Sequence, residues 1–268
     1  MSSLRFVVVC ALSACIFGGG GDDPTSDGRP LAGPDGEPIE LPEAPPQAPD
    51  DEVFALYERV VELANNPIPG NNNTRDSETY ALKRLVYTPG EAAYREQLCA
   101  TWGNEVFGVT WSFAADFPEL RGIQERTLVT LDDQVFEAGP YPDLLGTDVE
   151  TGPLPENPDD PGLVDLDLDG EPGVTVFIDG PVSGETYIAQ RSTTALRGDW
   201  FEDDMATGPI DTEVESNTLG ASNILLRIDP PTEPQPDKSF FVLMRIDPEL
   251  DCADIDARAE EWGLTERP

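Results

Sequence analysis

The segment VDLDLDGEPGVTVFI, from Val164 to Ile178, places three aspartates at alternate positions, then a Gly-Glu-Pro-Gly turn, then an alternating β-branched run. Glycine and proline in the middle of the segment mark a chain reversal, and alternating β-branched residues are typical of a strand. The flanking sequence repeats this pattern of short alternating runs separated by turn residues. We therefore expect an antiparallel β structure in which this strand pairs with its neighbours.

Short alternating runs predict about eight to ten strands, which is typical of a β-barrel or a β-sandwich. We expect strands at residues 78–86, 91–100, 106–113, 123–131, 134–138, 173–179, 185–192, 222–228 and 239–246, and one near Trp200. Residues 91–100 also fit a helix with a capping box. An all-β antiparallel barrel is favoured and a β-sandwich is the alternative, because an open sheet would leave an edge strand exposed.

One or two short helices are expected at the periphery of the β domain. Residues 51–64 place apolar side chains at i, i+3, i+4 and i+7, which predicts an amphipathic helix capped by Asp50 or Asp51. Residues 254–263 predict a short closing helix, and the proline-rich residues 140–161 predict a long loop.

The aspartates Asp165, Asp167 and Asp169, followed by Gly170, match the first half of an EF-hand calcium loop. The twelfth position, where an EF-hand carries glutamate, is Val176, so a true EF-hand is excluded. A shorter calcium loop remains open, with extra oxygens from Asp159, Asp160, Glu171 or Asp179. The favoured reading is a strand that buries Val164, Leu166 and Leu168 and leaves the three carboxylates in water, with the calcium loop as the alternative.

The amino terminus has the pattern of a bacterial lipoprotein signal. Residues 1–14 carry one positive charge and a short apolar run, too short to span a bilayer. The run ends in Leu-Ser-Ala-Cys, which predicts cleavage before Cys15 and acylation of this cysteine. Residues 15–50 are rich in Pro, Gly, Asp and Glu, which predicts a disordered tether, and residues 51–268 are expected to form a single β-rich domain.

The cysteine count agrees with a lipid anchor. Loss of Cys10 with the signal leaves three cysteines, an odd number for an exported protein. If Cys15 carries the lipid, Cys99 and Cys252 remain as one disulfide pair, in a compartment where disulfides persist. Neither of the two has a CxxC neighbour, which argues against a metal site at the cysteines.

Composition restricts the chemistry available to the chain. The sequence has 53 acidic and 16 basic residues and no histidine. The negative charge opposes binding to nucleic acid and is typical of a surface kept soluble by charge. A Ser-His-Asp triad and histidine-ligated zinc are excluded, and no phosphate-binding glycine loop is present. We therefore expect no enzyme activity and no cofactor other than a possible calcium ion.

Several motifs together resemble uncharacterised secreted lipoproteins that are common in myxobacteria. They are the lipobox, the acidic tether, Cys99, the run Asp165–Val176, the run Gly184–Arg191 (GETYIAQR), and Phe240–Leu243 followed by Cys252. Members of this family usually carry Asp-Gly-Asp-Gly before the proline, and Leu168 replaces the first glycine here. The resemblance implies an exported lipoprotein with a β-rich domain, and it implies no specific activity.

The sequence leaves three functional hypotheses. The favoured one is a non-catalytic, monomeric lipoprotein of the bacterial envelope, anchored by its lipid to the outer membrane, whose barrel contacts a protein or a polysaccharide. The second is a lipocalin-like carrier of a small apolar ligand, with Phe107, Val109, Trp111 and Val242 as lining residues. The third, and least favoured, is a hydrolase that uses paired carboxylates.

Overall fold

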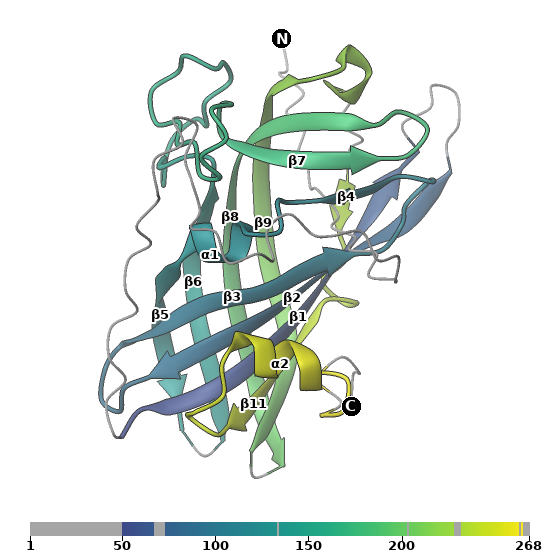
Figure 1. Ribbon diagram of the computed structural model, residues 1–268. Helices are drawn as coiled ribbons and strands as arrows, with labels where there is room; N and C mark the ends of the chain where they lie inside the picture. The colour runs from purple at the N-terminus through teal and green to yellow at the C-terminus, as the bar shows by residue number, and fades with distance from the viewer. Residues whose placement is uncertain are drawn as a thin grey trace.

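A computed structural model gives the fold and describes residues 50–66, 73–132, 134–202, 204–227, 232–262 and 264. The predicted signal segment, Cys15 and nearly all of the predicted tether lie outside these residues. Within the described part of the chain, eleven strands form one sheet, and two short α-helices and a 3-10 helix lie beside it (Figure 1).

The strands are β1 (Glu52–Asn65), β2 (Thr74–Tyr87), β3 (Ala93–Gly103), β4 (Thr110–Ser112), β5 (Ile123–Leu131), β6 (Val135–Leu145), β7 (Val174–Asp179), β8 (Gly184–Glu202), β9 (Met205–Ala221), β10 (Thr232–Pro234) and β11 (Phe240–Ile246). The helices are α1 (Phe117–Arg121), the 3-10 helix η1 (Ile224–Arg227) and α2 (Cys252–Arg258).

Eight of these strands close into an antiparallel barrel. The order around the barrel is β8-β6-β5-β3-β2-β1-β11-β9, and β9 pairs back onto β8. The β8–β9 hairpin runs the height of the molecule in Figure 1, and β7 and β4 continue the sheet from the first half of β8. The predicted barrel is therefore confirmed, and the β-sandwich alternative is wrong.

The interior of the barrel is filled by side chains that all eight barrel strands contribute. A cluster with members from every strand of a closed barrel can lie only inside it. Its buried members are Phe54, Leu56, Leu85, Tyr94, Leu128, Phe136, Ala138, Tyr141, Leu196, Ala206, Ile210, Phe241 and Leu243. Alternate residues on each strand point inward, as the period of two along a strand requires.

The first segment of the domain is a strand and not the predicted amphipathic helix. β1 pairs with β2 on one side and with β11 on the other, and both of its faces are buried. Phe54 and Leu56 point into the barrel, whereas Val53 and Tyr57 lie in a cluster on the outer face. A strand covered on both sides has an almost continuous apolar sequence, and such a sequence contains helical spacing by chance.

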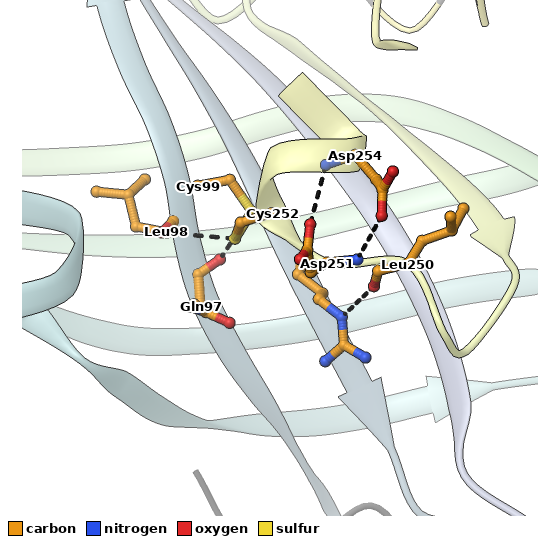
Figure 2. The surroundings of a disulfide bond; sticks show 8 residues. Gln97, Leu98, Cys99, Leu250, Asp251, Cys252 and Asp254 are labelled. Carbon is orange, nitrogen blue, oxygen red and sulfur yellow. Dashed lines mark hydrogen bonds between the residues drawn. A yellow bond between two sulfur atoms is a disulfide. The ribbon is translucent and has the colours of Figure 1, made fainter. Parts of the chain in front are cut away.

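The outer face of β1, β2 and β11 is covered by α2 and the residues after it. Ile255 and Ala259 pack on this face and are almost fully buried. A capping box between Asp251 and Asp254 starts α2, which begins and ends earlier than the predicted helix at 254–263. The disulfide between Cys99 of β3 and Cys252 fastens the start of α2 to the barrel wall (Figure 2). The predicted pairing of these cysteines is confirmed.

Two predicted strands differ from the structure. Of the predicted strand 222–228, the described residues 222–227 do not form a strand, because Asn223 caps a turn and Ile224–Arg227 form η1. In the predicted strand 106–113, only Thr110–Ser112 is a strand; Phe107 and Gly108 have positive φ angles and form a tight turn closed by Val106 and Val109.

Two other segments are clarified by the structure. Residues 93–103 form β3, so the strand prediction for residues 91–100 is confirmed and the helix alternative is wrong. The predicted loop 140–161 begins later than expected, because β6 continues through Pro140 to Leu145. Pro140 falls at the irregular step in the β6–β8 ladder, where a missing N–H is tolerated. None of the helices in the described residues is long and apolar enough to cross a membrane.

Candidate metal centre

The aspartate-rich segment is an ordered loop that leads into β7, and the predicted edge strand at residues 164–169 is wrong. The amide of Val164 donates to the carbonyl of Gly146 at 3.2 Å, and the amide of Leu166 donates to the carbonyl of Gly173 at 3.0 Å. Leu166 packs against the apolar cluster around Trp111 and Val174. These contacts hold the loop against the end of the barrel.

The backbone at Leu168 explains why the segment cannot be a strand. Leu168 has a φ angle of 57°, in the left-handed region that glycine adopts most easily. The left-handed residue turns the chain between Asp167 and Asp169, so the aspartates converge and do not alternate along an extended strand.

The three predicted ligands, Asp165, Asp167 and Asp169, come together. Each offers a carboxylate oxygen, and these oxygens lie within 4.8 Å of one another. Two oxygens on opposite sides of a calcium ion are separated by about twice the Ca–O distance of 2.3–2.6 Å. The three oxygens are therefore close enough to contact one ion.

Hydrogen bonds fix the orientation of the carboxylates. Asp165 accepts from the amide of Gly170 at 3.0 Å, and Asp167 accepts from the amide of Thr175 at 2.7 Å. Asp169 accepts from the amide of Glu171 at 2.8 Å and from the hydroxyl of Thr175 at 2.6 Å. These bonds use one oxygen of Asp165 and one of Asp167.

The other oxygens of Asp165 and Asp167 have no hydrogen-bond donor within the described structure. Both Oδ1 atoms are buried from solvent. A buried carboxylate oxygen without a donor is costly, and two neighbouring carboxylates repel each other. The pKa of Asp167 is raised to about 6, chiefly by burial; the charges of Asp169 and Asp165 contribute to the rise, and the hydrogen bond from Thr175 opposes it. A bound cation would compensate both oxygens.

The donor set fits a hard cation such as calcium, which prefers carboxylate, carbonyl and water oxygens. Calcium takes about six to eight oxygens, so carbonyls or water would have to complete the shell. Of the additional ligands considered from the sequence, Asp160 accepts from the amides of Glu156 and Asn157 and so closes its own turn. Asp179 lies at the far end of β7, opposite Thr110.

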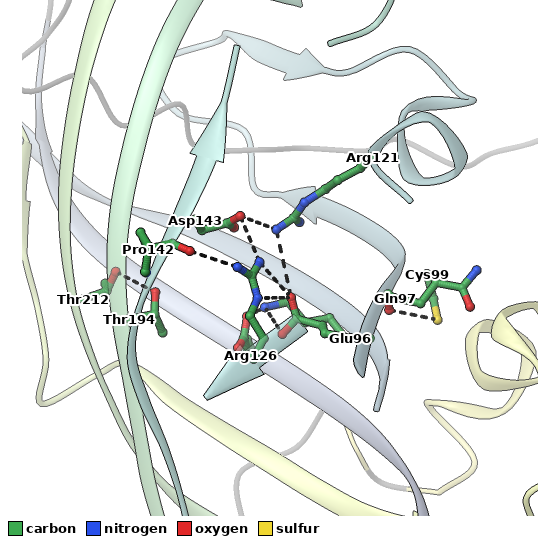
Figure 3. Close-up of polar contacts among 11 residues, drawn as sticks. Glu96, Gln97, Cys99, Arg121, Arg126, Pro142, Asp143, Thr194 and Thr212 are labelled. Carbon is green, nitrogen blue, oxygen red and sulfur yellow. Dashed lines mark hydrogen bonds and ion pairs between the residues drawn. The ribbon is translucent and has the colours of Figure 1, made fainter. Parts of the chain in front are cut away.

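A second polar cluster, which the sequence analysis missed, lies inside the barrel (Figure 3). We call it the interior ion cluster; its members are Glu58, Lys83, Glu96, Arg121, Arg126 and Asp143. Five come from β1, β2, β3, β5 and β6, and Arg121 comes from the end of α1. Three acids thus meet three bases in the interior.

Ion pairs connect the members of the interior ion cluster. Lys83 Nζ lies 2.7 Å from Glu58 and 3.4 Å from Glu96. Arg126 lies 3.2 Å from Glu96 and 3.0 Å from Asp143, and it donates to the carbonyl of Pro142 at 2.9 Å. Arg121 also pairs with Asp143. The cluster therefore joins neighbouring strands through their side chains as well as through the sheet.

The pairing favours the charged forms of Asp143 and Lys83, whereas burial dominates at Glu58. Burial by itself would raise the pKa of Asp143, but Arg121, Arg126 and Lys83 outweigh this effect and hold the pKa at about 2. For Lys83, burial would lower the pKa, and the charges of Glu58 and Glu96 raise it overall. Burial raises the pKa of Glu58, although Lys83 opposes the rise.

Some polar atoms of this region have no hydrogen-bond partner among the described residues. They are Glu58 Oε1, which is buried, and Glu96 Oε2, which is buried with Lys83 Nζ at 3.4 Å as its nearby cation. Buried water with two to four polar neighbours is the common way in which proteins satisfy such atoms. This part of the barrel interior is thus charged and polar, which does not suit an apolar ligand.

A signal for the interior ion cluster was present in the sequence. Lys83 alternates with Leu85, and Arg126 alternates with Leu128, on the inward face of β2 and of β5. A charged residue in phase with apolar core positions indicates a buried charge, which requires a partner of opposite sign.

The residues expected to line a carrier cavity do not come together. Trp111 packs with Phe117 and Val174, whereas Val242 lies on the outer face of the barrel under α2. Phe107 and Val109 belong to the turn before β4 and lie outside both clusters. Cys15 lies outside the described residues.

Comparison with known protein families, with curated proteins and with solved structures gave no match to this chain.

Proposed function

We propose that the chain is a non-catalytic lipoprotein of the bacterial envelope, anchored through Cys15 to the outer membrane, whose barrel is a rigid interaction domain. The filled barrel interior is the observation that supports this function. Large side chains from all eight barrel strands and the interior ion cluster occupy it. The outer surface and the loops are then the parts that can contact a protein or polysaccharide partner.

The carrier hypothesis has less support. An apolar ligand would have to displace paired ions such as Lys83 and Glu58 from a buried site, and breaking a buried ion pair is strongly unfavourable.

The hydrolase hypothesis also has little support. Glu96 is buried, and Asp143, whose side chain is 21% exposed, is paired with Arg121 and Arg126, so neither carboxylate is free to act on a substrate.

We further propose that Asp165, Asp167 and Asp169 bind one calcium ion, which stabilises the loop at the end of the barrel. The two buried, unpartnered oxygens of Asp165 and Asp167 carry this proposal. The loop is already oriented by its hydrogen bonds to Gly170, Glu171 and Thr175. Calcium would then act as a structural ion and take no part in a reaction.

The calcium proposal is tested by thermal unfolding of the full chain in calcium and in chelator. Free calcium at about 100 times Kd stabilises a protein by about 2.7 kcal/mol, which raises Tm by roughly 5–10 °C for a domain of this size. Asp167→Asn should remove this calcium-dependent rise. The control, Asp211→Asn, removes an exposed carboxylate from β9 and should retain the rise. An unchanged wild-type Tm in calcium and chelator would refute the site.

The anchor is tested by expression in a bacterium that exports lipoproteins. Cys15→Ser should move the protein from the membrane fraction to the soluble fraction and abolish its labelling by fatty acid. Cys10→Ser is the matched control, because Cys10 lies within the segment that is expected to be removed. Equal membrane association of both variants would argue against acylation at Cys15.

A further inference from the structure

We propose that the outer face of β1, β2 and β3 binds an uncharged polysaccharide through a ledge of aromatic rings, a surface that we call the aromatic ledge. It is defined by Tyr57, Arg59, Glu78, Tyr80 and Trp102. The inference rests on the proposal that the outer surface of the barrel contacts a partner, and it names the chemistry of that partner.

Strand register places the members of the aromatic ledge side by side. Arg59 of β1 is directly opposite Tyr80 of β2, and Tyr80 is directly opposite Trp102 of β3. Residues that are directly opposite on neighbouring strands point to the same face of a sheet. These three side chains therefore form one row across three strands, on the face that is outside the barrel.

The rings in this row are nearly parallel. The ring centroids of Tyr80 and Trp102 are 5.5 Å apart, with an angle of 19° between the ring planes. Tyr57 lies beside them on the same face, with its ring 6.1 Å from Tyr80 and at 26° to it, and it is almost fully buried. Tyr80 and Trp102 pack against the buried cluster that contains Tyr57, but they are themselves only half-buried.

Polar groups beside the rings are already fixed in place. Arg59 holds Glu78 with two contacts, at 3.0 Å from Nε and 2.9 Å from Nη2, and the hydroxyl of Tyr80 also donates to Glu78. The side chains of Arg59 and Glu78 are 31% and 18% exposed, so both remain accessible to a ligand. Burial opposes ionisation of Glu78, but these donors lower its pKa overall. Glu78 is thus a charged acceptor at neutral pH.

This combination suits a sugar. The C–H face of a pyranose ring carries partial positive charge and packs on the negative face of an aromatic ring, while its hydroxyls require fixed donors and acceptors. The ledge carries one Arg paired with one Glu and so has no net charge, in a chain whose formal charge is −37. An anionic polymer would be repelled by the rest of the surface, which favours an uncharged one.

The test is affinity electrophoresis of the full chain carrying Cys15→Ser, in gels that contain hydroxyethyl cellulose, glycogen or alginate. We expect one or both neutral polymers to retard the protein, and alginate to have no effect. Trp102→Leu keeps apolar volume but removes the flat ring, and it should weaken the retardation by about tenfold or more. Phe201→Ala, which removes an exposed aromatic ring at the end of β8, should not weaken it.

Folding of each variant is monitored by thermal unfolding, and Tyr80→Phe gives a second measurement that keeps the ring and loses only its hydroxyl. Weaker retardation of Tyr80→Phe at unchanged Tm supports the aromatic ledge. Absence of retardation by both neutral polymers, retardation by alginate alone, or full retardation of a folded Trp102→Leu protein overturns it. Absence of retardation by both neutral polymers, together with capture of an envelope protein by wild type and Trp102→Leu alike, would refute the ledge and leave the proposed interaction domain intact.

Discussion

Glu96 of β3 and Arg126 of β5 form an ion pair inside the barrel, with Nη2 3.2 Å from Oε1 (Figure 3). β3 and β5 are neighbours in the sheet, but their register spans only Ala93–Gln97 of β3. The side-chain pair therefore adds a connection at the place where the ladder between these two strands is short. Glu96 also faces Lys83, so its charge balances more than one cation.

We predict that Glu96→Gln destabilises the fold by about 3–5 kcal/mol, because it leaves buried cations without their counter-charge. The free energy of unfolding in urea measures this loss. The matched control is Glu137→Gln, which breaks an ion pair with Arg197, a residue that is 68% exposed, and it should cost less than about 1 kcal/mol. Equal losses in the two variants would show that the interior ion cluster does not stabilise the barrel.

The disulfide closes a loop of 153 residues between β3 and α2. In the chain-entropy model a cross-link over such a loop stabilises the folded state by up to about 5 kcal/mol. We expect the Cys99→Ser/Cys252→Ser double variant to unfold at a lower urea concentration than the oxidised protein, and α2 to lose protection from hydrogen exchange first. A reductant should lower the midpoint of the wild type and leave the double variant unchanged. Two thiols titrated in the exported wild-type protein would contradict the prediction.

Where only one face of a strand is buried, the sequence predicts the element well. In β5 the predicted range 123–131 coincides with the strand. The side chains of Arg126 and Leu128 are buried, and Thr127 between them is exposed. β1 was misread because its outer face is covered by Ile255 and Ala259, which are distant in sequence. No local pattern records such a cover, since it depends on how the chain closes.

At the candidate metal centre, too, one part of the arrangement could be predicted from the sequence and another part could not. The sequence left two readings of Asp165, Asp167 and Asp169, an edge strand and a calcium loop, and the structure brings the three carboxylates together as the second reading requires. The left-handed conformation of Leu168 could not be predicted from its own residue type, because leucine rarely adopts it. The alternation of leucine and aspartate therefore suggested an edge strand, whereas contacts of Leu166 with the barrel end impose a loop.

Glu62 makes the stability depend on pH in the neutral range. Burial against β10 raises its pKa from 4.5 to about 8, and a hydrogen bond from Thr232 only partly opposes the rise. A carboxyl whose pKa is higher in the folded than in the unfolded chain lowers the free energy of unfolding. The loss is largest at a pH above both pKa values, where the carboxyl is ionised in the unfolded chain and must also ionise in the folded one. This destabilisation is absent below about pH 4.5, grows as the pH rises, and is complete above about pH 8.

We therefore predict that Glu62→Gln stabilises the protein at pH 8, by on the order of 2–4 kcal/mol, and has little effect at pH 4. Urea unfolding of wild type and variant across this pH range gives the difference. Glu213→Gln, at an exposed position on β9, is the control for loss of one negative charge. A stabilisation that is the same at pH 4 and pH 8 would mean that titration of Glu62 is not its cause.

Gly173 supports the aspartate loop at a point where no side chain fits. Its φ angle is +91°, and a Cβ at this position would lie 2.3 Å from the carbonyl oxygen of Ile188. Its own carbonyl accepts the amide of Leu166, so a shift at Gly173 would move the aspartates. Gly152 has the same φ of +91° but open space around it. A comparison of alanine variants at the two glycines therefore separates the cost of backbone strain from the cost of the steric clash.

We predict that Gly152→Ala costs about 1 kcal/mol, from the left-handed backbone alone, whereas Gly173→Ala costs a further 1–3 kcal/mol or so from the clash with β8. Thermal unfolding in chelator gives the two losses without any contribution from calcium. The displaced loop should also make Gly173→Ala less responsive to added calcium than Gly152→Ala. If both variants lose the same stability, Ile188 yields to the new methyl group and the loop is not held as tightly as the structure indicates.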